Sequence, residues 1–300
     1  MTMKNMISAF LLILLIFPFL LTFSQSAGDY SEYGKLVKIP LSSAPFPHPL
    51  RSSGHTYNGK EYPADIHYSD STVAIFIPNG FNPEKTTDFV FYFHGWYNNI
   101  DTALALFNIT EQFTESGKNA ILIFPEGPRN SPDSFGGKLE DSLGFQILMN
   151  DILEYLSHTN TIHGKNIGSI VLSGHSGAYR IISSIIMVGG LTPFIKEVYL
   201  FDALYDRLAV FTQWIIESKG RFINIFTPEG GTKDMSLLMI EDLTDWNAPP
   251  LLIIESAVDE DILMNNKVIF IDSPLEHNDV IAKNKQFFYY LKTSSLMNIQ

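Results

Sequence analysis

Short apolar runs alternate with longer segments of helical spacing through most of this chain, and this alternation constrains the fold more than any other feature. Beyond Pro83, the apolar runs lie at residues 89–93, 120–124, 167–172, 198–201, 222–226 and 268–271. The segments of helical spacing lie directly after Ser176 and at residues 103–113, 143–156, 208–216 and 280–291. The runs are apolar without polar alternation, which is typical of strands that helices cover on both faces. The pattern therefore predicts an α/β fold, with a mostly parallel central sheet and helices on both faces.

The segment at residues 27–82 differs from the rest in composition. It is rich in Pro, Ser, Gly and Tyr and contains two strand-like runs, at residues 36–39 and 73–77. We interpret it as an N-terminal segment that adds edge strands to a core at residues 83–300, within a single domain. Residues 251–255 form either an extra strand or an insertion.

Residues 1–26 have the features of a signal peptide. An apolar run at residues 7–23 is followed by Ser24 and Ser26, which provide small side chains for cleavage before Ala27. We therefore expect an exported protein, periplasmic or secreted; the alternative is an uncleaved run that anchors the chain to a membrane. The chain contains no cysteine, which excludes disulfides, a thiolate nucleophile and cysteine metal ligands.

The charge of the chain disfavours a nucleic-acid partner. Its 20 basic and 32 acidic residues give a formal net charge of -12, whereas phosphate contacts need clustered Lys and Arg. Histidine and carboxylate spacings typical of metal sites, such as HExxH, do not occur in the sequence. We expect neither a metal nor a cofactor.

The sequence Gly174-His175-Ser176-Gly177-Ala178 stands between an apolar run and a segment of helical spacing. A sharp strand-to-helix turn requires small residues two positions before and after its central serine, and Gly174 and Ala178 occupy those positions. Such a turn exposes the serine hydroxyl and directs the N–H groups of the helix start toward a bound oxygen. Ser176 is therefore the candidate nucleophile.

A serine nucleophile needs an imidazole base and a carboxylate that orients it. His277 follows the last apolar run and precedes the final helical segment, which makes it the candidate base. Two residues are candidates for the acid. Asp202 directly follows the run at 198–201, and Glu229 lies on a glycine-rich loop after the next run. We favour Asp202. A carboxylate beside a buried strand needs hydrogen-bond partners to offset the loss of water, and His277 could be one of them, whereas Glu229 on its loop can be solvated by water.

The loop after the run at 89–93 supplies the remaining candidates. Gly95 lets backbone N–H groups approach a bound oxygen, so we expect the N–H of Trp96, together with that of Gly177, to form an oxyanion hole. We interpret His94 as a hydrogen-bonding residue that fixes this loop. The aromatic side chains expected near the turn either line a substrate pocket or are ordinary core and surface residues; they are Trp96, Tyr97, Phe135 and Tyr179.

The order of strand, nucleophile turn, acid and histidine resembles the α/β-hydrolase superfamily over about residues 89–291. The resemblance implies a triad of Ser176, His277 and either Asp202 or Glu229. Two features depart from the family pattern. Ala178 stands where glycine is more frequent, and many members take the acid from the strand after the one that ends at Asp202, which keeps Glu229 as an alternative.

These observations predict an exported serine hydrolase that cleaves a carboxylic ester or amide through an acyl-enzyme on Ser176. Its partner would be a small-molecule or polymer-derived ester or amide, so an esterase, an amidase and a peptidase are all compatible with the residues. Two alternatives stay open. One is a catalytically silent binding protein with the same fold, and the other is an acyltransferase that uses the same triad.

Overall fold

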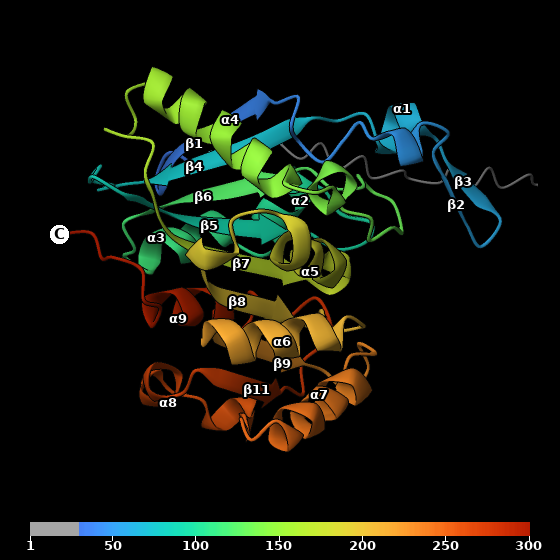
Figure 1. The fold of residues 1–300 in the computed structure, drawn as a ribbon, viewed down its shortest axis with the longest axis vertical. Coiled ribbons are helices and arrows are strands. Elements are labelled where there is room, and N and C mark those ends of the chain that lie inside the picture. The colour runs from blue at the N-terminus through green and yellow to red at the C-terminus, as the bar shows by residue number, and fades with distance from the viewer. Residues whose placement is uncertain (1–29) are drawn as a thin grey trace, which may run out of the picture.

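A central sheet of nine strands organises the part of the chain that the computed structural model describes, residues 30–300 (Figure 1). The predicted signal peptide, residues 1–26, lies outside the described residues. The strand order is β1-β4-β6-β5-β7-β8-β9-β11-β10. Only β1 with β4 and β4 with β6 pair antiparallel in this sheet, and all its other neighbours are parallel. The predicted mostly parallel sheet is confirmed.

The strands of this sheet are β1 Gly34–Pro40, β4 Thr72–Pro78, β5 Thr87–Phe93, β6 Ala120–Pro125, β7 Ile167–His175, β8 Ile195–Phe201, β9 Arg221–Phe226, β10 Leu251–Ile254 and β11 Val268–Asp272. The helices are α1 Ala64–His67, α2 Ile100–Leu106, α3 Ile109–Glu115, α4 Gly144–His158, α5 Tyr179–Val188, α6 Leu208–Ser218, α7 Lys233–Asp245, α8 Glu260–Asn265 and α9 Gln286–Lys292. Within residues 30–300, none of these helices has the length and apolarity needed to cross a membrane.

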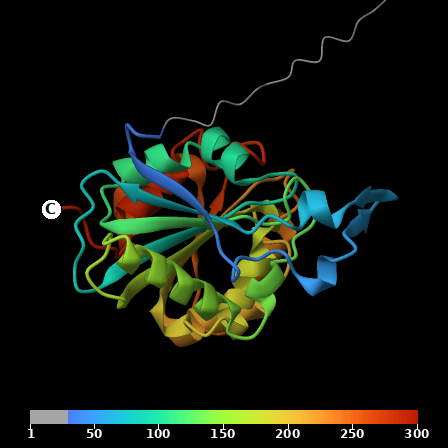
Figure 2. The ribbon, with the colours of Figure 1, turned by 90° about the horizontal axis from the view of Figure 1, so that it is seen from above.

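Helices cover both faces of the sheet because the central strands are apolar on both sides. In β5, Phe89 and Phe91 pack in a core with side chains of α4, α5, α6 and α7. Val90 and Tyr92, which alternate with them and so face the other way, pack with side chains of α2, α3, α8 and α9. Figure 2 shows α2 and α3 on one side of the sheet and α4 and α5 on the other. Helices on both faces were predicted from the sequence.

The strand order makes the carboxyl ends of β5 and β7 the expected place for a crevice. The chain runs from β5 to β6 on one side and then returns to β7 on the other side of β5. Loops that leave adjacent strands in opposite directions open a crevice there, which is where open α/β sheets bind ligands. The register pairs Phe93 with Gly174 and His175 with Phe201, so the segments that follow β5, β7 and β8 start close together.

The structure differs from the sequence prediction in several local elements. The helix predicted at residues 103–113 is two helices, because Asn108 adopts a left-handed conformation between α2 and α3 with φ 48°. The last helix begins only at Gln286, after a left-handed Lys285. Residues 251–254 form β10, an extra edge strand parallel to β11. Helices α7 and α8 were not predicted.

A small hairpin was also missed. Strands β2 His55–Tyr57 and β3 Lys60–Tyr62 pair antiparallel in a separate sheet and project from the main body (Figures 1 and 2). Strands of three residues are too short to show a period in the sequence. The hairpin belongs to the segment at residues 27–82, and the boundaries given above for that segment stay a prediction.

Candidate active site

Ser176 lies at the sharp turn between β7 and α5. Its φ of 55° is left-handed, a conformation that costs energy in a residue with a side chain. The turn is closely packed, since a Cβ atom on Gly174 would lie 2.6 Å from the Cβ of Ala178. The small residues on either side of Ser176 are therefore required by the geometry, as the sequence predicted.

The loop after β5 packs directly against this turn. A Cβ atom on Gly95 would lie 2.4 Å from the Cβ of Ser176 and 3.0 Å from its Oγ. A Cβ atom on Gly177 would lie 2.7 Å from Cδ1 of Trp96. The two backbone segments that carry the expected oxyanion donors, Trp96 and Gly177, are thus in close approach beside Ser176.

His94 fixes that loop from within. Its ring is buried, with Nδ1 2.7 Å from the carbonyl oxygen of Gly95 and Nε2 2.9 Å from Oε1 of Glu126. The N–H of Gly127 also donates to Nε2, at 3.1 Å. This arrangement agrees with the loop-fixing interpretation of His94.

Asp202 directly follows β8, and its side chain is fully buried. Its carboxylate accepts hydrogen bonds from the Thr227 N–H at 3.1 Å, the Thr227 hydroxyl at 2.7 Å and the hydroxyl of Thr232. Its Oδ2 lies 2.7 Å from Nδ1 of His277. Burial by itself would raise the pKa of Asp202, but the hydrogen bonds from His277, Thr232 and Thr227 hold that pKa below its ordinary value.

Glu229, the alternative acid, lies on the loop after β9 with its side chain exposed. The backbone of that loop, not its carboxylate, approaches Asp202: a Cβ atom on Gly230 would lie 1.8 Å from Oδ2 of Asp202. Because His277 contacts Asp202, the geometry favours Asp202 over Glu229.

His277 lies on the loop between β11 and α9 and contacts His175, the residue before Ser176. The two rings are 4.5 Å apart between centroids, and Nε2 of His175 lies 2.9 Å from the carbonyl oxygen of His277. Burial, and then the nearby His277, lowers the pKa of His175 to about 3. His175 is therefore neutral and can donate its Nε2 proton to that carbonyl. The sequence did not predict this role.

Tyr205 is a second residue that the sequence missed. Its side chain lies near Ser176, and its hydroxyl donates to the Gly230 carbonyl at 2.6 Å. Burial, and then the charge of Asp202, raises the pKa of Tyr205 to about 12, so the phenol stays protonated. In the sequence, only its position three residues after Asp202 indicated that Tyr205 could lie near the site.

Aromatic side chains flank the turn on the side of the hairpin. Trp96 and Tyr97 are 39% and 56% exposed. The Trp96 indole donates to the Ser134 hydroxyl at 2.8 Å, and its ring lies 5.2 Å from that of Tyr57. Tyr97 contacts Tyr62 of the same hairpin.

Two further aromatic candidates were named from the sequence. The Tyr179 ring lies 5.9 Å from that of Tyr205, next to the serine turn. Phe135, in contrast, is only 4% exposed and packs against Phe46 and His48. Phe135 is mainly a core residue, which was one of the two alternatives that the sequence left open.

Residues 30–300 contain no group of three His, Asp or Glu side chains placed to hold a metal ion. The site brings together an imidazole in contact with a buried carboxylate, on a loop that contacts the residue before Ser176.

Comparison with known proteins gives a likeness in structure only. Neither a family model nor a curated protein matches the sequence. Among solved structures, the substrate-bound fluorophosphonate-binding serine hydrolase F of Staphylococcus aureus matches with a TM-score of 0.54 at 10% identity, covering 88% of this chain and 100% of that one.

Two esterase structures are similar to a comparable degree. A mutant feruloyl esterase module from Clostridium thermocellum, complexed with sinapinate, has a TM-score of 0.52 at 12% identity, covering 87% of this chain and 88% of that one. A ferulic acid esterase has a TM-score of 0.54 at 10% identity, covering 87% of this chain and 98% of that one. At these identities, the likeness establishes the fold.

We predict that Asp202→Asn flattens the acid limb of the stability profile. In the wild type, the folded-state pKa of Asp202 is below its ordinary value of about 3.9. The resulting stabilisation is present above that value and is lost as the pH falls through the folded-state pKa. The free energy of unfolding in urea, measured between about pH 6 and pH 3, should fall less steeply below about pH 4 in the variant.

The control for this measurement is Asp65→Asn, which changes an exposed carboxylate in the first turn of α1. It should keep the wild-type profile. Parallel profiles for the wild type and Asp202→Asn would contradict the hydrogen-bonded state of Asp202.

Proposed function

We propose that this chain, which has the α/β-hydrolase fold, is a serine hydrolase that cleaves carboxylic esters. In this proposal Ser176 is the nucleophile, His277 the base and Asp202 the acid that orients the base. The observation that carries it is the 2.7 Å contact between His277 Nδ1 and Asp202 Oδ2, on a loop held against the serine turn.

The proposed reaction has two halves. Ser176 Oγ attacks the carbonyl carbon of the ester while Nε2 of His277 takes the hydroxyl proton. The buried carboxylate of Asp202 keeps the other proton on Nδ1 and stabilises the imidazolium that forms. The N–H groups of Trp96 and Gly177 donate to the oxyanion. As the tetrahedral intermediate collapses, His277 protonates the leaving alkoxide, and the acyl group stays on Ser176.

In the second half, His277 removes a proton from water, the hydroxide attacks the acyl carbon, and the proton returns to Ser176 as the acid leaves. Hydrolysis of an amide and transfer of the acyl group to another acceptor would use the same residues. The similarity to esterases and to a serine hydrolase supports the ester as the substrate.

The proposed substrate wall consists of exposed and half-buried aromatic rings beside Ser176. We assign Trp96, Tyr97 and Tyr179 to it, with Tyr57 of the hairpin supporting Trp96. Aromatic rings bind flat apolar groups through stacked and edge-on contacts. A small-molecule or polymer-derived ester with an aromatic or bulky acyl group fits this wall.

We also propose that residues 1–26 export the protein, a point that the N-terminal sequence of protein recovered outside the cell would check.

We predict that a fluorophosphonate probe labels the wild type and that Ser176→Ala abolishes both labelling and hydrolysis of chromogenic acyl esters. The reason is that the probe reacts only with a hydroxyl activated by a base. Ser169→Ala, at the amino-terminal end of β7, is the matched control and should keep both activities. A folded wild type that is neither labelled nor active would favour a binding protein instead, and labelling that survives Ser176→Ala would exclude Ser176 as the nucleophile.

We predict that Trp96→Ala lowers kcat/KM for aryl acyl esters by about tenfold, the equivalent of one lost aromatic contact. The change in kcat/KM for an acetyl ester should be much smaller, because an acetyl group is too short to reach the wall. Trp246→Ala removes an equally large exposed ring at the end of α7 and serves as the control. Equal losses for both esters in Trp96→Ala would show that Trp96 supports the loop without contacting the acyl group.

A further inference from the structure

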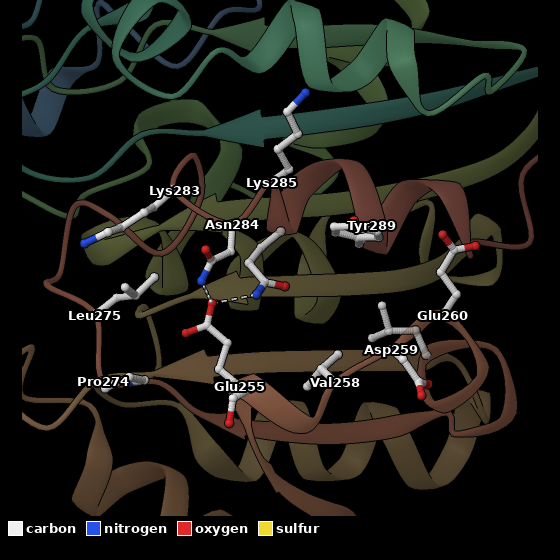
Figure 3. A pocket seen from close by; sticks show the side chains of 13 residues that line it. Glu255, Val258, Asp259, Glu260, Pro274, Leu275, Lys283, Asn284, Lys285 and Tyr289 are labelled. Carbon is white, nitrogen blue, oxygen red and sulfur yellow. Dashed lines mark hydrogen bonds between the residues drawn. The ribbon is translucent and has the colours of Figure 1, made fainter.

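The extra edge strand β10 ends next to a carboxylate that takes no part in the proposed reaction. Glu255 directly follows β10, and its side chain is only 7% exposed. It lies under the loop between β11 and α9, which is the loop that carries His277 (Figure 3). A buried carboxylate is costly unless hydrogen bonds satisfy it, so its partners indicate what it holds.

Its partners come from both ends of that loop. Oε1 of Glu255 accepts from the side-chain amides of Asn284 and Gln286, at 2.7 and 2.8 Å (Figure 3). Oε2 accepts from the hydroxyl of Ser273. The Ser273 oxygen in turn accepts from the N–H of Leu275, at 3.2 Å. One carboxylate therefore ties the start of the loop to its end, with His277 between them.

On the outer side of the loop, packed side chains do not hold it in place of these hydrogen bonds. A cavity of about 730 Å³ opens there, lined by Glu255, Leu275, Asn284 and residues of α8 and α9. Other contacts join the middle of the loop to the rest of the chain. They include the hydrogen bond of His277 with Asp202, that of its carbonyl with His175, and the donation from Gln112 to the Ile281 carbonyl at 3.2 Å. Val280 and Ile281 are also buried in the core.

We propose that Glu255 is a positioning residue for His277, holding both ends of the loop so that the imidazole keeps its place over Ser176. This inference rests on the proposed function, because it takes His277 as the base. A carboxylate suits this task because its two oxygens accept from several donors at once and repel none of them. An amide in its place carries no charge, offers one oxygen as an acceptor and adds an NH2 group, which can only donate.

The test is Glu255→Gln, which keeps the size of the side chain and turns one oxygen into a donor. The hydrogen bonds at both ends of the loop then become weaker, because the acceptor loses its charge, and an amide nitrogen turned toward Asn284 and Gln286 would face two donors. We expect kcat for ester hydrolysis to fall about tenfold with KM nearly unchanged, since small misplacements of a catalytic group reduce the rate and not substrate binding. Hydrogen–deuterium exchange of residues 274–285 should become faster.

The matched control is Glu197→Gln. Glu197 is also a buried carboxylate, with donors from Arg221, Tyr199 and Ser295, but it lies near the amino-terminal end of β8. This variant should lose stability while the exchange of residues 274–285 and kcat stay at wild-type values. Asn284→Ala, which removes one donor from an exposed residue, provides a milder second variant in case Glu255→Gln does not fold, and should show the same changes to a smaller extent.

Unchanged kcat and unchanged exchange in folded Glu255→Gln, or in Asn284→Ala if only that variant folds, would overturn the inference. The same loss of kcat in Glu197→Gln would do so too, because the effect would then be one of general stability. Failure of the proposed function is distinguishable, since the wild type would then neither hydrolyse the ester nor be labelled at Ser176.

Discussion

The contact between the buried carboxylate of Asp202 and the imidazole of His277 is the interaction on which the rest of the site depends. Asp202 is held by Thr227 and Thr232, so its position is set by the loop after β9. His277 comes from a different loop, after β11. The 2.7 Å contact joins the two loops and orients the ring. A carboxylate buried in this way is tolerated because its hydrogen bonds offset the cost of leaving water.

The serine turn imposes a second constraint, which is steric. Ser176 adopts a left-handed φ. Gly95 lies so close to Ser176, and Gly174 so close to Ala178, that neither glycine could carry a side chain. Such strain persists only where the surrounding structure fixes it. Here β5 and β7, with buried apolar side chains on both faces, provide the rigid support. The strain is therefore located at the residue that we propose as the nucleophile.

The sequence predicted the features that are local in the chain. Apolar runs gave the main strands, and the positions of Ser176, Asp202 and His277 directly after such runs placed them at one edge of the sheet. What it missed depends on partners far away in the chain. Asp202 was favoured over Glu229 from its place after a strand, but only the structure shows which carboxylate contacts His277. His175, Tyr205 and Glu255 gain their roles from residues that are 102, 25 and 29 to 31 positions away. The split helix at Asn108 reflects a backbone conformation that the apolar period does not encode.

A crystal structure of the protein after reaction with a fluorophosphonate would test the central claim most directly. We expect phosphorus bonded to Ser176 Oγ, the phosphoryl oxygen about 3 Å from the N–H groups of Trp96 and Gly177, and the His277 ring facing the adduct with Nδ1 still on Asp202. An adduct on another residue, or one whose phosphoryl oxygen points away from both N–H groups while His277 lies out of reach, would contradict the account.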